Sequence, residues 1–129
     1  MSSVLYVDDN EMDGMILEWQ LRKRDIDVTH VFSLREAAAA YLDDYYILVV
    51  IDWNLEPSNG AEVAHALLEI DPDVKVIFYS GAFSPDRLKA AQELNPLSCL
   101  TKTDDSYDVI AEHVTQLEKE KPASEDAGS

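Results

Sequence analysis

Cysteine and basic residues are both scarce in this sequence of 129 residues, which has one cysteine and 10 Lys and Arg residues against 26 Asp and Glu residues. The single Cys99 excludes a disulfide within the chain, and one cysteine with three histidines leaves no ligand set for zinc. A net charge of −16 is repelled by nucleic-acid phosphates and by anionic membranes. We therefore expect proteins or cations as partners, with no direct nucleic-acid or membrane binding.

Long apolar runs are also missing. No stretch of about 18 apolar residues is present to form a transmembrane helix, and the first residues lack the basic start and apolar core of a signal peptide. We expect a cytoplasmic protein. The 47% of hydrophobic residues are spread along most of the chain, which is long enough to bury one core. We assign residues 1–119 to one domain and predict a disordered polar tail over residues 120–129.

Five short segments are typical of β-strands. Four of them are mostly continuous apolar runs, as in strands that are buried on both faces of a sheet. The fifth, over residues 27–32, alternates polar and apolar side chains, and we place it at the edge of the sheet. The four apolar runs cover residues 4–7, 46–51, 74–79 and 97–100.

Helical patterns alternate with these strands. Four of the five predicted helices follow a polar residue that can cap their first turn, namely Asn10, Ser33, Asn59 and Ser84. The alternation predicts an α/β fold with a five-stranded parallel sheet and helices on both faces. We expect the flavodoxin-like, doubly wound (βα)5 arrangement with strand order 2-1-3-4-5.

The first predicted helix carries four large apolar residues at helical spacing: Met12, Met15, Ile16 and Trp19. This spacing places them on one face of the helix. We interpret the stripe as part of the core, with a partner-binding surface as the less favoured alternative.

Polar residues follow the central strands at the point where ligands bind in doubly wound sheets, outside the carboxyl ends of the strands. Clustered carboxylates repel one another unless a cation is bound, and carboxylate oxygens suit Mg²⁺. A hydroxyl and an ammonium group beside them would contact the oxygens of a phosphate group. The residues that we expect at this edge are Asp8, Asp9, Asp52, Ser80 and Lys102.

This set, in its order and spacing, resembles the receiver domain of two-component response regulators over about residues 3–119. The resemblance rests on Asp8-Asp9, Asp52-Trp53-Asn54, Tyr79-Ser80-Gly81-Ala82 and Lys102. It implies that Asp52 accepts a phosphoryl group from a histidine kinase or a histidine phosphotransfer protein. Phosphorylation would then change how the chain binds a downstream protein.

The resemblance also implies a role for each residue of the site. Asp9 would bind Mg²⁺ directly and Asp8 would hold one of its waters. Lys102 would pair with Asp52 and then with the phosphoryl group, while Ser80 would hydrogen-bond another phosphoryl oxygen. Self-phosphorylation and autodephosphorylation are the only reactions expected, so the chain would not be an enzyme. The residues implied to bind Mg²⁺, directly or through one of its waters, are Asp8, Asp9, Asp52 and Asn54 by its backbone carbonyl.

Three positions depart from the family pattern. Glu56 stands four residues after Asp52, where receiver domains usually have proline, and Pro57 comes one residue later. Cys99 stands where receiver domains usually have an aromatic residue that moves on activation, and Thr103 follows Lys102 where proline is usual. A receiver-like interaction module that works without phosphorylation is therefore an alternative. An aspartyl-phosphate phosphatase is a further alternative, although such enzymes usually have a second acid where Asn54 stands. The sequence leaves homodimer formation open.

Overall fold

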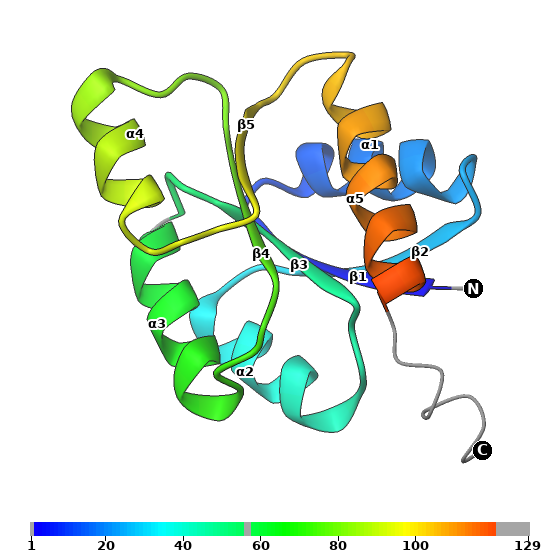
Figure 1. Cartoon of the computed structure of the whole chain (residues 1–129), viewed down its shortest axis with the longest axis horizontal. Coiled ribbons are helices and arrows are strands. Elements are labelled where there is room, and N and C mark those ends of the chain that lie inside the picture. The colour runs from blue at the N-terminus through cyan, green and yellow to red at the C-terminus, as the bar shows by residue number, and fades with distance from the viewer. Residues whose placement is uncertain (1, 56–57, 121–129) are drawn as a thin grey trace.

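A computed structural model of the chain describes residues 2–55 and 58–120, and in this part of the chain each strand is followed by a helix (Figure 1). The predicted tail lies outside the described residues, apart from Glu120, which is the last residue of a helix. The strands are β1 (Ser2–Val7), β2 (Ile26–Val31), β3 (Leu48–Asp52), β4 (Val76–Ser80) and β5 (Ser98–Thr101). The helices are α1 (Glu11–Arg22), α2 (Leu34–Asp43), α3 (Gly60–Ile70), α4 (Pro85–Gln92) and α5 (Ser106–Glu120).

The five strands form one parallel sheet in the order β2-β1-β3-β4-β5, which confirms the predicted topology. Val7 at the end of β1 pairs with Ile51, and Asp52 at the end of β3 pairs with Tyr79. The residues that follow these strands are therefore neighbours at one edge of the sheet.

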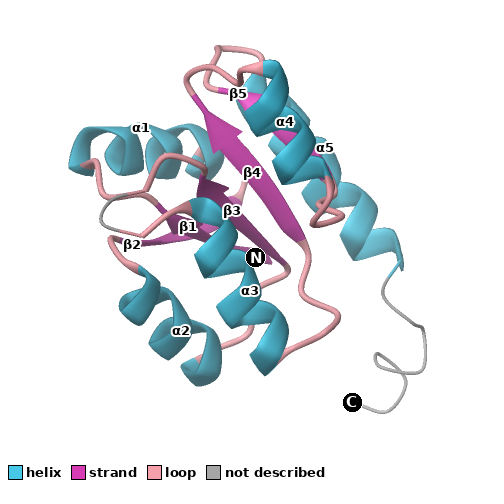
Figure 2. Cartoon of the chain, turned by 90° about the vertical axis from the view of Figure 1, so that its left-hand side faces the viewer, coloured by secondary structure: helices cyan, strands magenta, loops and turns pink. Residues whose placement is uncertain are grey.

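Helices cover both faces of the sheet (Figure 2), and each face has its own apolar core. One face packs against α1 and α5, and the other packs against α2, α3 and α4. Among the described residues, no helix combines the length and the apolar character needed to cross a membrane. The buried helix residues are Leu17, Leu21, Ile110 and Val114 on the first face, and Ala37, Val63, Ala64, Leu67 and Ala91 on the second.

Side-chain caps start four of the helices as predicted. In each case the side-chain oxygen of the cap accepts a hydrogen bond from the backbone N–H three residues later, at distances from 2.9 to 3.3 Å. These bonds satisfy N–H groups that have no partner within the helix. The four caps are Asn10, Ser33, Asn59 and Ser84.

The interpretation of the α1 stripe as core is wrong. Met12, Met15, Ile16 and Trp19 are 40–62% exposed. The face of α1 that meets the sheet is formed by Gly14, Leu17 and Leu21, which have the same helical spacing. A glycine occupies one of these core positions because the ring of His30 fills the space beside it.

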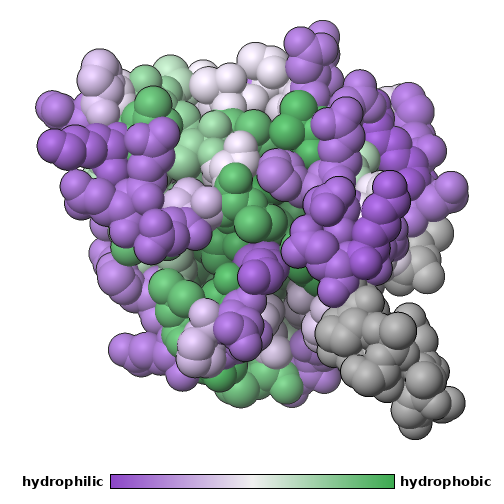
Figure 3. Space-filling view, in the orientation of Figure 1, coloured by the Kyte–Doolittle hydropathy of each residue, from purple (hydrophilic) through white to green (hydrophobic). Residues whose placement is uncertain are grey.

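The prediction that the last strand is buried on both faces is also wrong. By the observed strand order β5 is an edge strand, and its residues are half-buried or exposed. The neighbouring helix α4 is only eight residues long and buries only Ala91. Figure 3 shows an apolar band between the polar surfaces of α4 and α5, over β5. Cys99 is accordingly half-buried rather than part of a closed core.

We expect Gly14→Ala to lower the free energy of unfolding by about 1–3 kcal/mol, the usual cost of overpacking, although alanine favours helices. A Cβ at this position would lie 1.9 Å from Nδ1 of His30. The ring is held in place because its Nε2 is 2.7 Å from the carbonyl oxygen of Asp8 and because it stacks on Tyr6. Urea unfolding measures the change.

Gly81→Ala is the matched control, since a Cβ there meets no atom within 4 Å. We expect little change in stability from this substitution. Combining Gly14→Ala with His30→Ala should recover part of the lost stability. Equal effects of the two glycine substitutions would contradict the assignment of Gly14 to a crowded core position.

Candidate functional site

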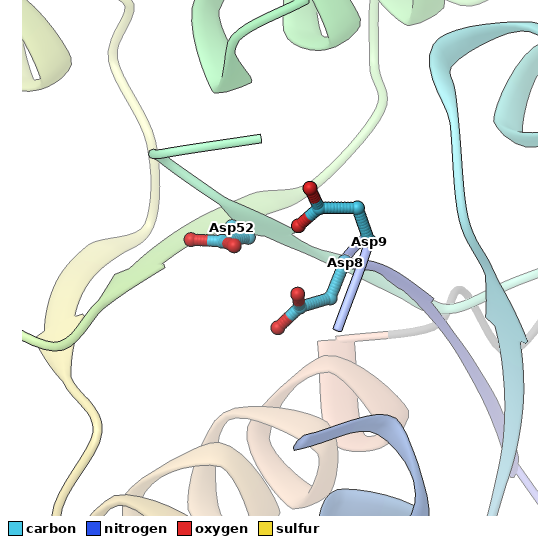
Figure 4. A group of neighbouring side chains, drawn as sticks. All are labelled: Asp8, Asp9 and Asp52. Atoms are coloured by element: carbon cyan, nitrogen blue, oxygen red, sulfur yellow. The ribbon is translucent and has the colours of Figure 1, made fainter. Parts of the chain in front are cut away.

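Three carboxylates lie together at the carboxyl edge of the sheet, beside one another in Figure 4. Asp8 and Asp9 directly follow β1, and Asp52 is the last residue of β3. One carboxylate oxygen from each lies within 4.8 Å of the other two. Asp8 and Asp52 are 0% and 5% exposed, whereas Asp9 is exposed to solvent. The predicted acidic cluster is therefore present.

Asp8 is held by hydrogen bonds to both of its carboxylate oxygens. Oδ2 accepts bonds from the Tyr6 hydroxyl at 2.5 Å and from Lys102 Nζ at 3.0 Å, and Oδ1 accepts a bond from the Asn10 N–H at 2.8 Å. Burial and the negative charge of Asp8 raise the pKa of Tyr6, so the phenol remains a donor. Asp9 is the member of the cluster that an ion arriving from solvent meets first.

Lys102 contacts three carboxylates from the end of β5. Its Nζ lies 2.9 Å from Asp13, 3.0 Å from Asp8 and 3.8 Å from Asp52. Burial alone would lower the pKa of Lys102, but hydrogen bonds to Asp13 and Asp8 and the charge of Asp52 raise it above its ordinary value. The side chain is therefore charged. It lies closer to Asp8 than to Asp52, the partner that the sequence analysis named.

Asp13 is a site residue that the sequence analysis missed. It lies in the first turn of α1, which begins two residues after the Asp8-Asp9 pair, so its sequence position places it at the same sheet edge. This position could have identified Asp13 as a site residue. An acidic residue in the first turn of a helix is, however, ordinarily explained by the helix dipole.

The carboxyl group of Asp52 is buried. Burial and the neighbouring charge of Asp8 raise its pKa to about 6, against the opposing effect of Lys102. The Asn54 N–H donates a hydrogen bond to Oδ1 at 3.1 Å. The carboxylate is therefore ionised at neutral pH, as a nucleophile must be. Gly60, at the start of α3, lets this helix approach closely, since a Cβ there would lie 2.9 Å from the Asp52 carbonyl oxygen.

Ser80 is completely buried at the end of β4. Its Oγ donates a hydrogen bond to the Ala82 carbonyl oxygen at 2.8 Å and accepts one from Nδ2 of Asn54 at 2.9 Å. The backbone N–H of Lys102 donates to the Ser80 carbonyl oxygen at 2.8 Å, which ties the ends of β4 and β5 together. Ser80 and Lys102 thus lie at the predicted edge.

Asn54 has a side-chain role that the sequence analysis did not predict. Besides its bond to Ser80, its Oδ1 accepts a hydrogen bond from Nη1 of Arg87 at 3.2 Å. Its backbone carbonyl as a metal ligand stays a prediction.

The donor set fits Mg²⁺. The three carboxylates have ligand oxygens close together, and two of them are buried. Lys102 supplies one positive charge against their three negative charges. A divalent cation with oxygen ligands would remove the remaining repulsion. Asp8, Asp9 and Asp52 are the described residues that could hold it.

Comparison with known proteins agrees with this geometry. The family model of the response regulator receiver domain matches residues 4–115. The response regulator receiver protein CpdR of Brucella abortus is 31% identical over 87 residues, which cover 64% of this chain and 72% of that protein.

Solved structures share the fold. The receiver domain of the Francisella response regulator 1452 has a TM-score of 0.81 at 22% identity, over 95% of this chain and 100% of that one. The response regulator TrrA of Thermotoga maritima, solved in complex with Mg²⁺ and BeF, has a TM-score of 0.78 at 24% identity, over 91% of this chain and 99% of that one.

The raised pKa of Asp52 predicts how stability depends on pH without divalent cations. A carboxyl whose pKa rises from 3.8 to about 6 on folding stabilises the fold below pH 4, and this contribution is lost as the pH rises through about 6. Asp52→Asn should therefore raise the free energy of unfolding at pH 8 by on the order of 1–3 kcal/mol, with a smaller gain near pH 4.

Denaturant unfolding in chelator at several pH values measures this difference. The control is Asp27→Asn, which removes an exposed carboxylate from β2 and should change stability little at any pH. If Asp52→Asn gives the same gain at pH 4 and pH 8, the cause is not the charge of Asp52.

Proposed function

This chain belongs to the response regulator receiver domain family, and on that premise we propose that it is the phosphoacceptor of a two-component phosphorelay. A histidine kinase or histidine phosphotransfer protein would phosphorylate Asp52, and the modified chain would change its contacts with a downstream protein. The observation that carries the proposal is the buried Asp52 carboxylate, placed beside two further carboxylates and the charged Lys102.

The proposed reaction is the transfer of a phosphoryl group between two side chains. A carboxylate oxygen of Asp52 forms a bond to phosphorus, and the bond from phosphorus to the imidazole nitrogen of the donor breaks, with its electron pair returning to that nitrogen. Mg²⁺ held by Asp8, Asp9, Asp52 and the Asn54 carbonyl would neutralise the phosphoryl oxygens. The chain itself would contribute mainly by positioning the reacting groups, because the transfer involves little other covalent chemistry.

Lys102 and Ser80 supply the remaining contacts in this proposal. Lys102 Nζ lies 3.8 Å from Asp52 Oδ2, so a small movement away from Asp13 would bring it to a phosphoryl oxygen. The Ser80 hydroxyl would reach another phosphoryl oxygen by turning from the Ala82 carbonyl. Both contacts become more favourable as negative charge is added at Asp52.

The exposed face of α1 supports a docking site for the phosphodonor. Met12, Met15, Ile16 and Trp19 form an apolar surface on an otherwise strongly acidic chain. Ile16 also lines a small cavity of about 140 Å³ together with Asp13 and Lys102, so this surface continues to the site. A donor protein bound to α1 would bring its phosphohistidine toward Asp52.

The first test is phosphorylation by acetyl phosphate, followed by intact mass. We expect one phosphoryl group on the wild type in the presence of Mg²⁺, none in chelator and none on Asp52→Asn, because Asp52 is the proposed nucleophile. Lys102→Ala should accept the group but lose the conformational response. Asp27→Asn, which removes an exposed carboxylate, should behave as the wild type.

Two results would contradict the proposal. Phosphorylation of Asp52→Asn at the wild-type rate would show that the acceptor is another residue. Failure of the wild type to accept a phosphoryl group from acetyl phosphate and from protein donors, while still binding Mg²⁺, would favour an interaction module that works without phosphorylation.

The docking surface on α1 predicts a defect that depends on the donor. Trp19→Ala should slow transfer from a phosphorylated kinase or phosphotransfer protein that is active on the wild type by at least about tenfold, as loss of a central aromatic contact usually does. Phosphorylation by acetyl phosphate should be unchanged. Lys23 Nζ lies 4.2 Å from the Trp19 ring centroid and supports the exposed ring.

Leu42→Ala is the matched control. Leu42 is 69% exposed on α2, which covers the opposite face of the sheet. Rates with both types of donor are compared in parallel. An equal loss in both substitutions, or a loss with acetyl phosphate as well, would contradict docking at α1.

A further inference from the structure

The helix α4 is weakly attached to the rest of the chain. It has eight residues, and it buries only Ala91. An open cavity of about 600 Å³ lies between α3 and α4, with Trp53, Asn54, His65, Arg87, Ala90 and Leu94 among the residues that line it. A shift of α4 would therefore break few core contacts and would have space to occur.

Three side chains connect the phosphoacceptor site to this helix, and we call them the Ser80–Asn54–Arg87 relay. Asn54 Nδ2 donates to Ser80 Oγ at 2.9 Å, and Arg87 Nη1 donates to Asn54 Oδ1 at 3.2 Å. The backbone N–H of Asn54 also donates to Oδ1 of Asp52. Asn54 thus contacts the acceptor, the hydroxyl beside it and the first turn of α4 at once.

Phosphorylation of Asp52 would disturb this relay at Ser80. The Ser80 hydroxyl has one proton, which it donates to the Ala82 carbonyl. To bond a phosphoryl oxygen it must turn and give up that bond. If the Ser80 side chain turns about its Cα–Cβ bond, Oγ moves with it, and Asn54 Nδ2 would follow Oγ or donate to the phosphoryl group itself. In either case the Asn54 amide would turn, and its Oδ1 would move away from Nη1 of Arg87.

Resting on the proposed function, we propose that Arg87 is a positioning residue that holds α4 through Asn54 while Asp52 is unphosphorylated, and releases α4 when Ser80 turns. The relay would couple the site to α4 in a chain that has Cys99, in β5, in place of the usual aromatic residue. Cys99 is half-buried against the same core cluster as Trp53 and Phe83. The coupling would thus use polar groups rather than the movement of a ring.

The test compares Arg87→Met with Lys89→Met by hydrogen exchange of the α4 amides, with and without beryllofluoride and Mg²⁺. Methionine keeps an apolar stem and removes the positive charge. Both side chains are exposed on α4, but only Arg87 bonds to Asn54 among the contacts of the described residues. Phosphorylation of each protein by acetyl phosphate is first checked by intact mass.

We expect beryllofluoride to speed α4 exchange in the wild type and in Lys89→Met by roughly twofold to tenfold, the range for loss of one hydrogen bond. Arg87→Met should exchange at the faster rate in both states, while accepting phosphoryl groups as the wild type does. Its thermal unfolding midpoint should match that of Lys89→Met, so general destabilisation would not explain the result.

Two results would overturn the inference while leaving the proposed function intact. One is a full beryllofluoride response in Arg87→Met. The other is a phosphorylated wild type whose α4 exchange does not change. If the wild type accepts no phosphoryl group from any donor, the proposed function fails first, and the inference fails with it.

Discussion

Repulsion among three carboxylates is the constraint on which the site depends. The strand order puts the ends of β1 and β3 side by side, so Asp8, Asp9 and Asp52 cannot avoid one another. Lys102 supplies one positive charge, and the Tyr6 hydroxyl and backbone N–H groups donate hydrogen bonds to these carboxylates. Because this compensation is incomplete, the site favours a divalent cation, and the raised pKa of Asp52 has the same origin.

The two helices beside the site differ in how they are attached to the sheet. Leu17 and Leu21 anchor α1 in the core, which leaves its outer apolar stripe exposed. By contrast, α4 has one buried residue and a polar link through Arg87. In our proposals a firmly packed helix therefore receives the donor, and a weakly packed helix on the opposite face of the sheet responds.

The fold and the acidic cluster could be predicted because they follow from local patterns. Apolar runs, caps and alternation predict a doubly wound parallel sheet, and in the order 2-1-3-4-5 the ends of the central strands come together. The exposed stripe on α1 could not be predicted, because the core position opposite His30 is held by Gly14, which has no hydrophobic signal. The Asn54–Arg87 hydrogen bond could not be predicted from the sequence either, since its partners lie 33 residues apart and meet only in the folded chain.

Replacement of the usual aromatic by Cys99 changes what kind of coupling this domain can use. Cys99 has no ring that could move on activation. Hydrogen bonds need no ring, because they respond to where charge and protons are placed. In our proposals a negative group added at Asp52 competes for the Ser80 proton, and Asn54 transmits that competition to α4. The loss of an aromatic switch is therefore compatible with a phosphorylation-dependent output.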